Sequence, residues 1–253
     1  MSPRQFIRER QLSLAIDKCQ HLEISAKSSH DQQFFLDACP VSQTDEVTDL
    51  GIRICSNLKW DRHIAVIKKK SVARCYQILN SFRTKNIWIL KKAFITYVRP
   101  ILETNSTVWC PYLVKDIEAV ERVQRKFVKA ICRRCNIRTT SYTERLNILG
   151  MESLEYRRLK FDIIMVFKII NKLVDLDCND FFSFPTTTYN LRRHRFTISH
   201  SKCNTNIHKF FFSNRIVKSW NSLPEEIVTS TTLCSFRNRL NKFDLRTVQN
   251  MVY

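Results

Sequence analysis

The sequence is poor in glycine, with only Gly51 and Gly150 among its 253 residues. Glycine-rich phosphate-binding loops need several glycines close together, so the P-loop and the dinucleotide-binding fingerprint are excluded. The sequence also has no adjacent pair of aspartates. Its longest apolar run, residues 161–174, is interrupted by two lysines, an aspartate and an asparagine. Such a run is too short and too charged to cross a bilayer.

The composition is that of a globular protein. Hydrophobic residues make up 44% of the chain, enough for a sizeable core in one or two domains. Ten cysteines are scattered without framework spacing, and the first ten residues are polar and of mixed charge. We therefore expect no signal peptide or transmembrane segment, and a reducing compartment, the cytosol or the nucleus.

Positive charge is concentrated in the middle of the chain. The net charge is +19, and residues 59–135 carry 18 Lys or Arg residues against 5 Asp or Glu residues. Residues 1–58 carry 6 against 8. An excess of this size predicts a polyanionic partner, either nucleic acid or an anionic membrane surface. The alternative is a solvated basic surface without a dedicated ligand.

Hydrophobic periodicity predicts a mostly helical α+β fold with three parts, residues 1–58, 59–135 and 136–253. Apolar residues alternate with polar ones in the first part, and after Trp60 they recur every three or four residues. The expected strands are residues 12–16, 21–25, 34–37 and 48–55. The expected helices are residues 60–82, 86–98, 115–133, 142–149, 154–173, 208–223 and 233–243. Candidate N-caps are Asn86, Ser141 (with Glu144 as a capping box) and Ser153, and Gly150 suits a helix end.

The helix expected at residues 115–133 is apolar on one face and cationic on the other. Its predicted buried residues are Ile117, Val120, Gln124, Phe127 and Ile131. Arg122, Lys126, Lys129 and Arg133 follow at i, i+4, i+7 and i+11, on nearly the opposite side. The pattern favours contact with a phosphate backbone, and we predict the same role for Lys68, Lys69, Lys70, Arg74, Arg125 and Arg134. Binding to a membrane is less favoured, because the apolar face is needed for the core.

A second basic cluster contains Arg192, Arg193 and Arg195. Tyr189 and Phe196 flank it, so an aromatic ring could stack there on an unpaired base. A solvated loop is the alternative. The tryptophans Trp109 and Trp220, and similarly Trp60 and Trp88, are predicted to anchor the core.

Cys132 and Cys135 form a single Cys-x-x-Cys pair. It could be half of a zinc site completed from His194, His200, Cys203 or His208. No second pair supports this, so our prediction is that the chain binds no metal and no cofactor.

Several short segments form an ordered pattern along the chain: residues 14–19 (LAIDKC), 49–52 (DLGI) with 58–60 (LKW), 97–103 (YVRPILE), 108–112 (VWCPY), 211–217 (FFSNRIV), 220–226 (WNSLPEE) and 235–240 (SFRNRL). In this order they resemble segments of the reverse transcriptases of non-LTR (LINE-type) retrotransposons. The last three are similar to the C-terminal signature of jockey-like elements. Ala15 departs from the pattern, which has asparagine there.

The resemblance implies a palm-edge hairpin near residues 49–52, a thumb-like helical bundle that grips template–primer duplex, and a C-terminal helical region. It also implies that Lys18 lies close to the incoming nucleotide. The aspartates of the catalytic palm have no counterpart in the chain, and two-metal nucleotidyl transfer depends on them. We therefore expect a truncated derivative that binds RNA or DNA duplex without polymerase activity of its own. Two alternatives are a fragment that works with a palm supplied in trans, and a protein-interaction module built on the tail helices.

Overall fold

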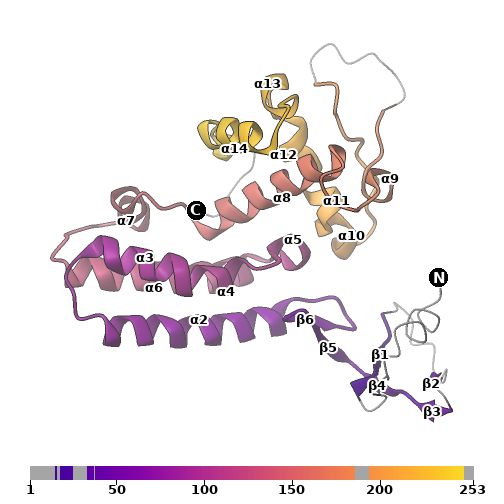
Figure 1. Cartoon of the computed structure of the whole chain (residues 1–253), viewed down its shortest axis with the longest axis horizontal. Coiled ribbons are helices and arrows are strands. Elements are labelled where there is room, and N and C mark those ends of the chain that lie inside the picture. Colours follow the sequence, from indigo (N-terminus) through magenta and orange to yellow (C-terminus); the bar gives the residue numbers. More distant parts are fainter. Residues whose placement is uncertain (1–14, 16–17, 25–32, 37, 186–193, 248–253) are drawn as a thin grey trace. The chain divides into compact units, whose positions relative to one another are not determined.

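The computed structural model describes residues 15, 18–24, 33–36, 38–185 and 194–247, and the fold is α+β and mostly helical, as predicted (Figure 1). Contacts divide the chain into two compact units, residues 1–63 and 64–253. The boundary between the two units, at 63/64, lies within five residues of the predicted boundary at 58/59. The predicted boundary at 135/136 falls inside the second unit.

The described residues of the first unit form three two-stranded sheets. Strand β1 (Gln20–Leu22) pairs in parallel with β4 (Ser42–Thr44), and β2 (Phe35–Leu36) pairs antiparallel with β3 (Cys39–Pro40). The strand predicted at residues 12–16 lies largely outside the described residues.

Residues 46–55 form a hairpin, in place of the single strand that the alternation at 48–55 predicted. Strand β5 (Glu46–Asp49) pairs antiparallel with β6 (Ile52–Cys55), and Asp49 lies opposite Ile52. Leu50 and Gly51 form the two-residue turn, with φ of +46° and +82°. Positive φ at both positions matches the right-handed twist of the strands and reverses the chain.

Helix α2 (Asp61–Ser81) begins in the first unit and continues into the second. Helical spacing predicts that six residues of this segment face inward, namely Ile64, Ile67, Ser71, Cys75, Ile78 and Phe82. The first five are buried, whereas Phe82, just past the end of α2, is 38% exposed.

Helix α3 (Ile87–Tyr97) starts directly after Asn86, its predicted N-cap. The Asn86 side chain accepts hydrogen bonds from the backbone N–H groups of Trp88 and Ile89. Helical spacing predicts that Leu90, Phe94, Tyr97 and Val98 face inward. Three of them are buried, but Tyr97 is 54% exposed, so the prediction is wrong for that residue. Pro100 stands in the first turn of the next helix, α4 (Arg99–Glu103), where its missing N–H costs no helical bond.

Helix α6 (Val114–Arg134) packs against α3, α7 (Tyr142–Leu149) and α8 (Leu154–Ile170), and α3 and α6 lie side by side in Figure 1. The rings of Phe94 and Phe127 stack between α3 and α6 with centroids 4.8 Å apart. The capping box of Ser141 and Glu144, the left-handed Gly150 and the N-cap Ser153 are all present as predicted.

A second part of the core joins α8 to the tail. Its buried residues include Ile163, Phe167, Trp220 and Phe236, and the rings of Phe167 and Phe236 stack 4.0 Å apart. Two further short helices are α5 (Ser106–Trp109), which precedes α8 in the chain, and α9 (Cys178–Phe181), which follows it. The tail ends in α13 (Glu225–Val228), α14 (Leu233–Lys242) and a 3-10 turn (Leu245–Thr247).

The single helix predicted at residues 208–223 is wrong. The structure has three short helices instead, α10 (Asn206–Phe210), α11 (Phe212–Arg215) and α12 (Val217–Asn221). Phe211 is extended at the first break. The side chain of Asn214 donates to the His208 carbonyl and that of Arg215 to the Phe210 carbonyl, so the groups freed by the break are satisfied.

Two of the four predicted tryptophan anchors are confirmed. Trp109 and Trp220 are fully buried, and their indole N–H groups donate to the carbonyls of Thr104 and Phe196. Trp88 is 59% exposed, so its assignment to the core was wrong, and Trp60 is half-buried. Within the described ranges, no helix has the length and hydrophobicity needed to cross a membrane.

Candidate nucleic-acid interface

Helix α6 buries one face and exposes cations on the other, as its sequence predicted. Ile117, Val120, Gln124, Phe127 and Ile131 are buried. Four of its five exposed cations, which we call the α6 stripe, are Arg122, Lys126, Lys129 and Arg133. Among the described residues, one acid lies near the stripe, with 3.7 Å between Nη2 of Arg122 and Oε2 of Glu118.

Buried polar contacts fix the rotation of α6 about its axis. The Gln124 side chain donates to the Tyr142 hydroxyl and to the Glu152 carbonyl, each at 2.9 Å. Glu121 is fully buried and accepts hydrogen bonds from Tyr142 and from the backbone N–H of Leu154. Because one face is held in this way, the stripe on the opposite face points to solvent.

Two other predicted contacts on α6 have structural roles. Both terminal nitrogens of Arg134 donate to α2 and its end, Nη1 to the Phe82 carbonyl at 2.7 Å and Nη2 to the Leu79 carbonyl at 2.8 Å. Arg125 is half-buried, with its guanidinium 5.2 Å from the centroid of the Tyr142 ring. These cations therefore have less freedom to reach a phosphate than the stripe has.

The cations of α2 are exposed but do not share one line. Lys68, Lys69 and Lys70 are consecutive, and successive residues turn by about 100° around a helix. Lys70 and Arg74, one turn apart, lie on the same side. The Arg74 guanidinium also donates to the Gln77 side chain at 3.0 Å.

An open cleft of about 550 Å³ lies at the C-terminal end of α6. Among the described residues, four cations and no acidic residue line it; the cations are Lys129 and Arg133 from the stripe, together with Arg138 and Arg145. Arg145 is 8% exposed and donates to the Thr139 hydroxyl at 3.2 Å, while its Nε has no hydrogen-bond partner. Sequence reasoning missed Arg138 and Arg145, because a loop arginine and an arginine on a short capped helix carry no periodic signal.

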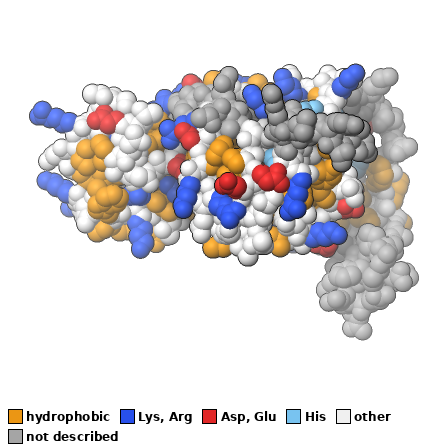
Figure 2. Space-filling view, turned by 90° about the horizontal axis from the view of Figure 1, so that it is seen from above, with side chains coloured by type: hydrophobic (Ala, Val, Ile, Leu, Met, Phe, Trp, Pro, Cys, Tyr) orange, Lys and Arg blue, Asp and Glu red, His pale blue; other side chains and the backbone are white. Residues whose placement is uncertain are grey.

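On the face of the molecule seen in Figure 2, Lys and Arg side chains stand at several separate places with Asp and Glu side chains among them. The cations visible there do not gather into one patch. The place of each cation on its helix is therefore a better guide to a binding surface than the net charge of the chain.

The other predicted contacts lie apart from α6 in the sequence. Arg195 is exposed, and its guanidinium lies 4.9 Å from the centroid of the Phe196 ring, so a cation already covers that ring. Arg192, Arg193 and Tyr189 lie outside the described residues. Lys18 is exposed in the first unit.

The Cys-x-x-Cys pair at the end of α6 is held by the fold. Cys132 is buried, and the Cys135 thiol donates to the Lys85 carbonyl at 2.9 Å. Burial raises the pKa of both thiols, which opposes the thiolate form that binds metal. His194, one of the suggested extra ligands, is buried with its Nε2 against the Trp220 carbonyl. In the described part of the chain, no three His, Cys, Asp or Glu residues are grouped as metal ligands.

Comparisons with known proteins give little more. No model of a known protein family matches the chain, and no solved structure matches it. The chain is similar to an uncharacterized protein of Caenorhabditis elegans, with 28% identity over 115 residues. The aligned region covers 46% of this chain and 58% of that relative, so the chain spans less than two-thirds of the protein it matches.

Proposed function

We propose that this chain derives from the reverse transcriptase of a non-LTR retrotransposon and binds RNA or DNA duplex through its phosphate backbone. The resemblance of seven ordered segments supports the origin. A hairpin at residues 46–55 followed directly by the long helix α2 is the order that the resemblance implies.

The α6 stripe is the observation that carries the binding proposal. From Arg122 to Arg133 the four cations span eleven residue-to-residue steps, or about 16 Å of helix. Duplex DNA carries one negative charge per about 1.7 Å of its axis, so several phosphates lie within reach of the stripe. The adjoining cleft, lined by Arg138 and Arg145, would extend the contact beyond the helix end. Contacts of this kind give affinity without sequence preference.

We propose further that the chain does not polymerise by itself. Two-metal catalysis needs carboxylates that converge on the ions. The chain has no Asp-Asp pair, and Glu46, the first residue of β5, is ion-paired with both Arg53 and Arg62. A palm supplied by another polypeptide remains the alternative, and primer extension that appears only after a palm-containing protein is added would favour it.

The tail helices offer less support for a protein-interaction module. Their large apolar residues Phe212, Ile216, Val217 and Trp220 are buried in the core of this chain. Ile207 and Phe211 are the exposed large apolar residues of α10 to α12.

The test is a titration of labelled duplex RNA and duplex DNA, followed by fluorescence anisotropy at several salt concentrations. With four phosphate contacts, affinity should fall about 100-fold between 50 and 200 mM salt, with little difference between sequences. A variant with the four stripe cations changed to glutamine should lose most of this dependence. The matched control changes four exposed cations elsewhere, Lys202, Lys218, Arg237 and Lys242, and should keep it. Equal losses in both variants would mean that net charge, not the stripe, governs binding.

A further inference from the structure

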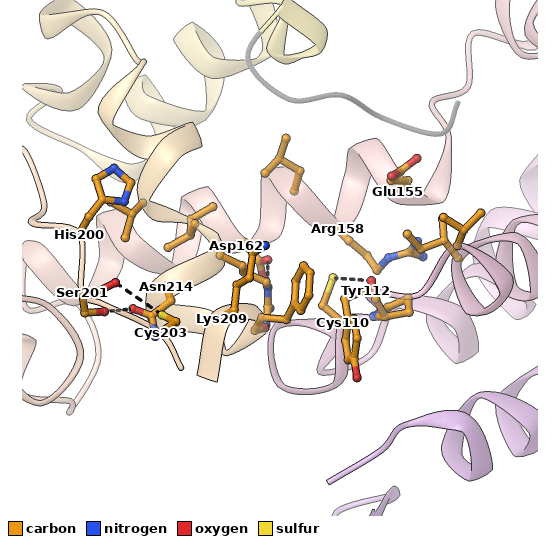
Figure 3. Close-up of a pocket in the computed structure, with 18 residues that line it drawn as sticks. Cys110, Tyr112, Glu155, Arg158, Asp162, His200, Ser201, Cys203, Lys209 and Asn214 are labelled. Atoms are coloured by element: carbon orange, nitrogen blue, oxygen red, sulfur yellow. Dashed lines mark hydrogen bonds and ion pairs between the residues drawn. The ribbon is translucent and has the colours of Figure 1, made fainter. Parts of the chain in front are cut away.

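A pocket of about 690 Å³ lies in the second unit, away from the α6 stripe. Its walls come from residues 110–117, from α8 and from residues 200–217. In Figure 3, Arg158, Cys110 and Tyr112 lie at one end, and His200, Ser201 and Cys203 lie at the other. Its volume is in the range of small-molecule sites.

Arg158, on α8, is the unusual residue of this pocket. Its side chain is 2% exposed, and within the described residues neither Nη1 nor Nη2 has an oxygen or nitrogen acceptor. The Cys110 thiol interacts with the guanidinium, but a thiol sulfur is only a weak acceptor. A buried guanidinium whose N–H groups are unsatisfied is costly, so the arrangement needs an explanation.

The two carboxylates near Arg158 do not supply the missing acceptors. Asp162 binds Arg215, with its Oδ2 accepting from Nε at 2.9 Å and its Oδ1 from Nη2 at 3.1 Å. Glu121 accepts from Tyr142 and from the backbone at the start of α8. Both carboxylates attract the charge of Arg158, but their oxygens are directed to other donors.

The rest of the lining suits a ligand with an apolar body. The rings of Tyr112 and Phe210 stack with centroids 4.4 Å apart and planes 9° apart, and Ile117 and Leu159 continue the wall. Lys209 adds a second cation to the lining. Of the two acidic side chains there, Asp162 is paired with Arg215, and Glu155 is half-buried.

We propose that this pocket binds a small molecule through one oxyanion, a phosphate or a carboxylate, held by the forked guanidinium of Arg158. The two terminal nitrogens would donate to two oxygens of the same group, which is the geometry that arginine provides and lysine does not. The apolar body of the ligand lies against the Tyr112 and Phe210 wall. This site is independent of nucleic-acid binding by α6.

The experiment measures binding of inorganic phosphate and of benzoate by calorimetry, at constant ionic strength. We expect at least one of them to bind wild-type protein saturably, and Arg158→Met to weaken that binding at least tenfold. Arg122→Gln removes one exposed arginine outside the pocket and should leave the affinity unchanged. The tighter of the two probes identifies the class of oxyanion.

Thermal unfolding distinguishes a binding residue from a structural one. Methionine is close to arginine in volume and removes a buried charge, so Arg158→Met without ligand should melt at or above the wild-type temperature. If that variant does not fold, Arg158→Lys, which keeps the charge but loses the fork, should still weaken binding at least threefold. Absence of saturable binding by both probes, or equal binding to wild type and the folded Arg158 variant, would overturn the proposal.

Discussion

The Glu121 carboxylate of α6 accepts a hydrogen bond from the backbone N–H of Leu154, with 2.9 Å between Oε2 and N. Leu154 is the first residue of α8, so this N–H has no acceptor within its own helix. A carboxylate is favourable at such a position because the N-terminus of a helix is its positive end. One buried side chain thus joins two helices and helps to turn Arg122 and Lys126 outward.

The pH dependence of the free energy of unfolding should show that the pKa of Glu121 is raised. Burial raises its pKa above the ordinary 4.5, although Tyr142, Arg158 and the backbone N–H groups of α8 oppose the shift. The folded state therefore holds the proton more tightly than the unfolded state, and the contribution of Glu121 to the free energy of unfolding declines as pH rises above about 4.5. Glutamine cannot titrate. The stability of wild type relative to Glu121→Gln should thus fall between pH 4 and pH 7.

Urea unfolding of both proteins at several pH values measures this difference. The comparison with the variant is needed because burial also raises the pKa of Asp162, which adds a decline of the same sign to both proteins. A difference that does not change with pH would show that the Glu121 pKa is not raised.

Substitution of Arg134 should lower stability without changing duplex binding, and substitution of Arg133 should do the reverse. Arg134→Gln removes two charge-assisted hydrogen bonds to the end of α2 and should lower the free energy of unfolding by about 1–2 kcal/mol. Arg133→Gln changes an exposed side chain and should stay within about 0.5 kcal/mol of wild type. In duplex titrations, Arg133→Gln should reduce the salt slope by about 1, and Arg134→Gln should leave it near wild type. A reduced slope in both variants would place Arg134 in the interface.

Trp220 and Trp88 provide a matched pair for the core. Trp220 is fully buried, packs near Phe236 and donates to the Phe196 carbonyl at 2.8 Å. Trp220→Ala should therefore cost about 3–5 kcal/mol in urea unfolding. Trp88 is 59% exposed, so Trp88→Ala should cost less than about 1 kcal/mol. Similar losses in the two variants would mean that Trp88 packs more tightly than its exposure indicates.

The features that sequence predicted well depend on nearby residues. Asn86, Ser141 and Ser153 each bond to backbone groups two or three residues away, so their types and spacing are enough to mark a helix start. The buried and cationic faces of α6 could be predicted because apolar and basic residues recur at helical spacing along its twenty-one residues.

The features that sequence missed depend on partners far along the chain. The break that separates α10 from α11 is stabilised by Arg215, whose ion-pair partner Asp162 lies 53 residues earlier. Arg145 and Arg158 are buried, although an arginine on a helix is ordinarily assigned to the surface. The spacing of nearby residues does not indicate their burial. Cys132 and Cys135 could be read in the sequence as half of a zinc site. The sequence could not show that the Cys135 thiol donates to the Lys85 carbonyl, 50 residues earlier.

The turn between β5 and β6 carries a residue poorly suited to its conformation. Leu50 has φ of +46° and is 85% exposed, so the side chain gains little from packing while its Cβ is strained. Asparagine tolerates positive φ, and Asn-Gly is the preferred pair for a two-residue turn of this kind. Leu50→Asn should therefore stabilise the hairpin by about 0.5–1 kcal/mol. A β-branched residue fits this region least, so Leu50→Val should destabilise it.

Hydrogen exchange at the amides of β5 and β6 reports on this hairpin directly. Exchange should slow by about twofold to fivefold in Leu50→Asn, the ratio that about 0.5–1 kcal/mol gives, and accelerate in Leu50→Val. Amides of α8 serve as an internal control, because a turn substitution in the first unit should not alter a helix of the second. If both variants exchange at the wild-type rate, Leu50 does not limit the hairpin, and the positive φ at this position carries no measurable strain.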